Sequence, residues 1–95
     1  MEGEEHHAIS QAVWEELQKY PRLNDCYKLK DPRFVLKGAN LAMHRGYETW
    51  ARETEKEIAI WLEKNKNADK KLFEWYLEWL YTHGDLAKRF PDGFM

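Results

Sequence analysis

The sequence predicts a mostly α, α+β domain in which helices pack against a minimal β element. Two segments, residues 40–64 and 69–82, carry apolar side chains at steps of three and four, which is the spacing of one face of an α-helix. Residues 22–38 lack this spacing and contain turn-forming proline and glycine. A chain of 95 residues is expected to form one domain, spanning residues 1–95.

The first third of the chain predicts a short helix between two extended segments. Residues 1–8 suit either a short strand or an unformed end. Ser10 can cap a helix over residues 11–19, because its hydroxyl can accept a bond from a free N–H of the first turn. Pro21 ends this helix, and the apolar run at residues 34–36 can form a second short strand.

The two long helices each have a predicted buried stripe. Gly46 weakens the first turns of the earlier helix, so a start after Gly46 stays open, and a polar run at residues 64–67 ends it. Its stripe is expected to hold Tyr47, Trp50, Ala51, Thr54, Ile58, Trp61 and Leu62. The later helix is expected to bury Leu72, Phe73, Tyr76, Leu77, Leu80 and Tyr81. Gly84 suits the position after its end, and the tail breaks at Pro91.

Composition excludes several classes of protein. Cys26 is the only cysteine, so neither an internal disulfide nor a zinc site built on cysteine pairs is expected. No apolar run approaches 18 residues, so we expect no membrane-spanning helix and no membrane partner. The paired histidines begin almost at residue 1, so we expect the chain to be a C-terminal fragment of a larger protein.

Charge is distributed unevenly along the chain. The formal net charge is −2, which argues weakly against nucleic-acid binding. Between Lys19 and Arg45, however, seven basic residues accompany only two acidic ones. Such a segment can follow a phosphate backbone, although an ordinary solvated loop with lysines explains it equally well. The candidate nucleic-acid contacts are Lys28, Lys30, Arg33, Lys37 and Arg45.

The histidine pair His6-His7 is the strongest candidate for chemistry. Adjacent side chains of an extended segment point to opposite faces, so one imidazole can face a metal while the other faces water. On the following helix, His44 and Glu48 are four residues apart and share a face, where they can supply a nitrogen and an oxygen ligand. Alternatives stay open: a tag remnant for the pair, a surface or core role for His44, a solvated face for Glu48, and a helix cap at Asn40.

Two runs carry a resemblance to a known family. HHAISQAVWEEL is similar to the opening of nuclease toxin domains of the HNH/endonuclease VII (His-Me finger) superfamily, in their AHH- and GHH-like forms. NLAMHRGYETW is similar to their second motif, and the ending DLAKRFPDGF also resembles theirs. These domains are the C-terminal tips of bacterial polymorphic toxins, either Rhs-type or secreted. The resemblance implies a ββα-metal core with added C-terminal helices.

The resemblance also implies roles for individual residues. His7 is the general base and Asn40 organises the loop. His6 and His44 bind one divalent metal ion (Mg, Mn, Ni or Zn), with Glu48 as a possible third ligand. The implied activity is metal-dependent hydrolysis of phosphodiester bonds, in DNA ahead of RNA. A cognate immunity protein is the implied partner, and the target-cell cytoplasm is the implied place of action of a delivered effector.

Two departures from the family pattern matter. Glu5 and His6 can instead be the ligand and the base, which moves both roles by one residue. Ala51 stands where related sequences often have a histidine, so this position can be an altered site, either natural or engineered. Two further readings remain: a non-catalytic interaction module with an exposed tryptophan surface, and an inactive relative that binds a structural metal.

Overall fold

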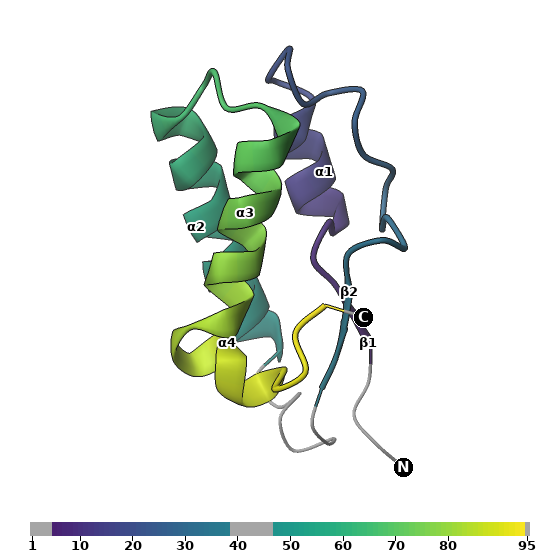
Figure 1. The fold of residues 1–95 in the computed structure, drawn as a ribbon, viewed down its shortest axis with the longest axis vertical. Helices are drawn as coiled ribbons and strands as arrows, with labels where there is room; N and C mark the ends of the chain where they lie inside the picture. The colour runs from purple at the N-terminus through teal and green to yellow at the C-terminus, as the bar shows by residue number, and fades with distance from the viewer. Residues whose placement is uncertain (1–4, 39–46, 95) are drawn as a thin grey trace.

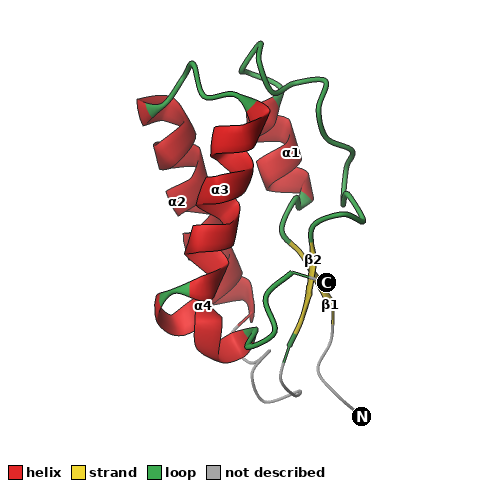
Figure 2. Ribbon diagram, in the orientation of Figure 1, coloured by secondary structure: helices red, strands yellow, loops and turns green. Residues whose placement is uncertain are grey.

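The computed structural model describes residues 5–38 and 47–94. The elements follow the order β1 (Glu5–His7), α1 (Gln11–Leu17), β2 (Val35–Lys37), α2 (Tyr47–Lys64), α3 (Lys70–Thr82) and α4 (Gly84–Arg89). Figure 1 shows α2 and α3 running along the long axis of the molecule, with the strand pair and α4 toward the same end. Figure 2 shows how small the β element is beside the helices, which confirms the predicted mostly helical α+β class.

The sheet consists of two antiparallel strands. β1 pairs with β2 in a register that sets Glu5 opposite Lys37 and His7 opposite Val35. An isolated bridge also joins Leu36 of β2 to Phe94. The tail of the chain therefore returns to the strand pair, a closure that the sequence did not predict.

Helix α1 begins where its cap predicts. Ser10 has extended backbone angles, and its side-chain oxygen accepts a hydrogen bond from the Val13 N–H. The same hydroxyl donates to a carboxylate oxygen of Glu55 at 2.6 Å, which ties the start of α1 to α2. The helix ends at Leu17, two residues earlier than predicted.

The predicted stripes of α2 and α3 are confirmed at most of their described positions. Asp69 caps α3 by accepting a bond from the Leu72 N–H. The two helices meet through Trp61 and Tyr76, whose rings stack at 4.4 Å. The prediction for Leu72 was wrong: this residue is 42 % exposed, because it lies on the side of α3 that also exposes Trp75 and Trp79. The Tyr47 side chain lies outside the described part of the structure.

The core forms where the three longer helices and the tail converge. Its largest fully buried side chains are Tyr81, Phe73, Phe90, Ile9, Leu17, Leu23, Leu36, Ile58, Leu62, Leu77 and Val13. Within the described residues, no helix is both long enough and apolar enough to cross a membrane.

Candidate functional site

The strand β1 sends its two histidines in opposite directions. His6 is buried, with 5 % of its surface exposed, whereas His7 is only partly buried. This confirms that the pair lies on an extended segment with its side chains on opposite faces. The two imidazoles therefore have different surroundings, one inside the protein and one at its surface.

His6 lies in a buried group of aromatic rings, which we call the His6 cluster (His6, Trp50, Tyr81 and Phe90). The imidazole stacks on Phe90 at 5.4 Å and contacts the rings of Trp50 at 5.1 Å and Tyr81 at 5.7 Å. Its Nε2 atom is 2.9 Å from the Tyr81 hydroxyl oxygen, and the tautomer decides which of the two groups donates. The cluster thus joins β1, α2, α3 and the residue after α4.

The surroundings of His6 restrict how it can bind a metal. The Nε2 atom is engaged by the Tyr81 hydroxyl, and only 5 % of the residue surface is exposed. The Tyr81 hydroxyl thereby fixes the orientation of the imidazole ring within the cluster. Within the described residues, no three His, Cys, Asp or Glu side chains are grouped as a metal site requires.

Several predicted site residues lie outside what the structure describes. Asn40, His44 and Arg45 fall in the segment 39–46, and only the backbone of Glu48 is described, in the first turn of α2. The contact between His6 and Trp50 nevertheless sets β1 beside the beginning of α2. Strand β1 and the helix that carries Glu48 are therefore neighbours.

Ala51 is buried in the core, with 5 % of its surface exposed. Replacing Ala51 by histidine would put a larger, polar side chain into packed surroundings. Such overpacking typically lowers the free energy of unfolding by about 1–3 kcal/mol. The burial gives alanine a packing role at this position, whatever its relation to the family pattern.

Three of the predicted phosphate contacts are exposed around the strand pair. Lys28, Lys30 and Lys37 are all exposed. Lys37 lies in β2 opposite Glu5, and the Lys30 N–H donates to the Ile9 carbonyl at 2.9 Å, two residues beyond His7. Lys30 adopts a left-handed φ of 53°. The basic loop is thus attached to the chain directly after β1.

Arg33 has a structural role in the same loop. Its guanidinium donates to Asp31 through two nitrogens, at 3.0 and 2.7 Å, and to the Cys26 carbonyl at 2.9 Å. Asp31 is 1 % exposed and also accepts bonds from the Lys28 and Arg33 backbone N–H groups. These bonds, led by that of the Arg33 guanidinium, hold the pKa of Asp31 well below its usual range. The charge of Arg33 is largely offset by Asp31, so its share in phosphate binding is reduced.

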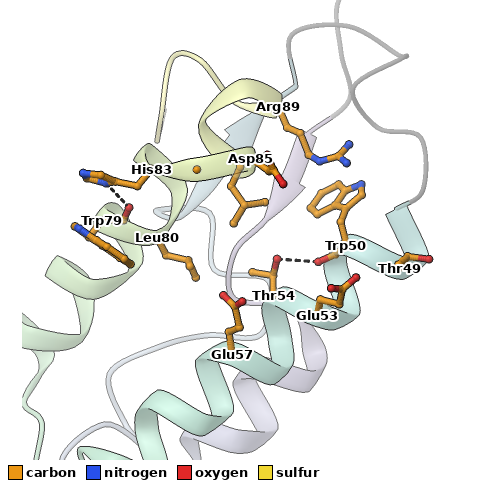
Figure 3. A pocket seen from close by; sticks show the side chains of 12 residues that line it. Thr49, Trp50, Glu53, Thr54, Glu57, Trp79, Leu80, His83, Asp85 and Arg89 are labelled. Atoms are coloured by element: carbon orange, nitrogen blue, oxygen red, sulfur yellow. Dashed lines mark hydrogen bonds between the residues drawn. The ribbon is translucent and has the colours of Figure 1, made fainter.

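The sequence did not reveal a groove between α2 and the α3–α4 corner. It has a volume of about 590 Å³, and Figure 3 shows Glu53 and Glu57 reaching it from α2 and Asp85 from α4. The guanidinium of Arg89 lies over the Trp50 ring, 5.0 Å from its centre. Three carboxylates make this groove unfavourable for a phosphate backbone.

His83 lies at the end of α3 and does not belong to the strand pair. It caps α3, its Nδ1 is 2.7 Å from the Trp79 carbonyl oxygen, and its ring stacks on Trp79 at 5.0 Å. Gly84 follows with a positive φ of 68°, as expected for the residue after a helix end. His83 therefore occupies a helix-end position.

Tyr81 and Phe90 are the functional candidates that sequence reasoning missed. Both touch His6 across more than seventy residues of chain, and no local pattern can indicate such a contact.

The chain matches no family model, no curated protein and no solved structure.

Proposed function

We propose that this chain is a metal-dependent endonuclease of the ββα-metal (His-Me finger) type that hydrolyses phosphodiester bonds in DNA. One observation carries the proposal: β1, with its paired histidines, packs against the beginning of α2 through the contact of His6 with Trp50. Glu48 lies in the first turn of α2, and His44 precedes Glu48 by four residues. A strand pair followed by a helix, with histidine on the strand, is the order of parts this chemistry needs.

The protein residues have separate tasks in this mechanism. His7, at the surface, takes a proton from the water that attacks phosphorus. His6, His44 and Glu48 would hold one divalent ion, which supplies charge stabilisation at the scissile phosphate when bound. The Tyr81 hydroxyl fixes the His6 ring at Nε2, and Asn40 organises the loop before α2.

The basic residues around the strand pair support a nucleic-acid substrate. Lys28, Lys30 and Lys37 are exposed on segments that pair with β1 or are bonded to the residue after it. With Arg45, they would bind phosphates on either side of the bond that is cut. The family resemblance adds the setting: a delivered bacterial toxin domain that acts in the target-cell cytoplasm and is blocked by an immunity protein.

The test is nicking of a supercoiled plasmid, with EDTA or with added Mg²⁺, Mn²⁺, Ni²⁺ or Zn²⁺. We expect metal-dependent nicking that His7→Ala reduces by a factor of about a hundred or more, because general-base catalysis contributes on that scale. Metal affinity, measured by calorimetry, should stay the same in His7→Ala. The matched control is His83→Ala, which removes a histidine at the helix end.

The same assay separates the two assignments of the histidine pair. If His7 is the base, His6→Ala weakens metal binding while His7→Ala does not. If Glu5 is the ligand and His6 the base, His6→Ala abolishes cleavage but keeps metal binding, and Glu5→Gln weakens metal binding. Absence of cleavage with every metal, in the chain and in Ala51→His alike, would refute the nuclease proposal.

A second candidate, an interaction module, is favoured by one observation. Trp75 and Trp79 are 58 % and 45 % exposed on one helix. Trp50, by contrast, is buried and Trp61 is partly buried, so half of the tryptophan surface expected for such a module is inside the protein.

A further inference from the structure

The outer face of α3 has a charged side and an apolar side. Leu72, Trp75 and Trp79 are 42 %, 58 % and 45 % exposed and follow one another at steps of three and four. Lys71 and Glu78 are exposed on the opposite flank of Trp75. Neither forms an ion pair with any residue in the described ranges. We call this surface, Lys71, Leu72, Trp75, Glu78 and Trp79, the α3 face.

The apolar side of the α3 face continues onto α2. Tyr76 lies next to this side on α3, and its ring stacks on Trp61 of α2 at 4.4 Å. Ile60, one residue before Trp61, is 46 % exposed. Four large apolar side chains are therefore exposed over two adjacent helices, which is more than scattered surface residues explain.

We propose that the α3 face binds the α3 face of a second copy of this chain, with the two helices antiparallel. In such a pair, a two-fold axis near Trp75 relates the two helices, which run in opposite directions. The charged side of one face then lies against the charged side of the other, and the apolar sides lie against each other. Lys71 then meets the partner's Glu78, and Leu72 meets the partner's Trp79. Each dimer gains two ion pairs and a continuous apolar centre.

A parallel pair does not have this complementarity. There, the charged side of one face meets the apolar side of the other, so Lys71 and Glu78 would lie against leucine and tryptophan. Burying unpaired charges against apolar groups is costly, so the charge pattern selects the antiparallel arrangement. This inference does not depend on the proposed nuclease function.

The size of the surface predicts a weak dimer. Stable dimers bury roughly 800 Å² and about 20–30 residues per partner, whereas the α3 face with Ile60 comprises only six residues. We therefore expect the full chain to go from monomer to dimer at micromolar to millimolar concentrations. Sedimentation equilibrium over that range measures the dissociation constant directly.

Charge-reversed variants of the full chain give the sharpest test. Lys71→Glu alone and Glu78→Lys alone each create two like-charge contacts in the dimer and should raise the dissociation constant about tenfold. Mixing the two variants restores opposite charges at both contacts, so the mixture should dimerise as well as the original chain. Because both positions are exposed, the variants should keep the thermal unfolding midpoint of the original.

Substitution at the centre of the face completes the test. Trp75→Glu should abolish the dimer, whereas Leu29→Glu, at a 48 % exposed leucine in the loop before β2, should leave it unchanged. A chain that is monomeric throughout the concentration range overturns the proposal. So does a dimer that survives Trp75→Glu, or a mixture of the charge-reversed variants that is no better associated than either alone.

Discussion

Two aromatic groups in this protein have similar ring geometry and opposite surroundings. In the His6 cluster, His6 stacks on Phe90 at 5.4 Å with an interplanar angle of 23°. On α3, Trp79 stacks on His83 at 5.0 Å with the same angle. Phe90 is 2 % exposed, however, while Trp79 is 45 % exposed.

The difference teaches that stacking geometry alone does not determine what an aromatic pair contributes. Trp79 and His83 are four residues apart on one helix, so their contact forms with the helix and excludes little water. His6 and Phe90 come from opposite ends of the chain, and two more elements close around them. Stability therefore depends on the His6 cluster, and the exposed rings of α3 remain available for binding.

Removing a buried ring of the His6 cluster and an exposed ring of α3 should give the largest contrast. Phe90→Ala leaves a cavity among His6, Trp50 and Tyr81 and should lower the free energy of unfolding by about 3–5 kcal/mol. Trp75→Ser removes a larger ring from the surface and should change it by less than about 0.5 kcal/mol. Urea unfolding at low protein concentration, where the chain is monomeric, measures both. Equal losses in the two variants would contradict the contrast.

A buried polar group outside the aromatic rings gives the next contrast. Asp31→Asn removes the charge that accepts bonds from Arg33 and from two backbone N–H groups. We expect a loss of about 2 kcal/mol at neutral pH, because buried donors lose part of their bonding. Lys19, an exposed residue just after α1 that pairs with Glu16 at 3.0 Å, provides a control: Lys19→Gln should have almost no effect.

The sign of the pH dependence follows from the lowered pKa of Asp31. A carboxylate with a lowered pKa in the folded state contributes its full stability above the unfolded value, near 3.9, and loses it as the pH falls toward the folded value. The difference between the original chain and Asp31→Asn should therefore be constant at neutral pH and shrink below about pH 4. A difference that grows on acidification would show that Asp31 is not held as a carboxylate.

The smallest expected effect tests whether His6 serves the core alone or also binds metal. Tyr81→Phe keeps the ring and removes the hydroxyl that bonds Nε2, so stability should fall by about 1 kcal/mol. If His6 also binds metal, the same variant should weaken metal affinity by about tenfold or more, since the fixed ring orientation is lost. Thr82→Ala, at an exposed position of α3, is the control for both measurements. An unchanged metal affinity with reduced stability would assign His6 to the core alone.

Local signals predicted most elements because they depend on neighbours in sequence. Ser10 and Asp69 cap helices through hydroxyl and carboxylate oxygens that reach only their own first turns. The period of apolar residues in α2 and α3 predicted their buried faces, and it failed at Leu72, which lies on the outer side of α3 beside Trp75 and Trp79. The opposite faces of His6 and His7 followed from the geometry of any strand.

The sequence by itself therefore determined the class of the fold, the main helices and the presence of a histidine pair near the start of the chain. Only the tertiary structure decided that His6 meets Tyr81 and Phe90, that the tail bridges back to β2, and that Leu72 is exposed. The physical reason is the range of the interactions. Caps and periodicity act within a few residues, whereas burial is decided by which distant segments come together.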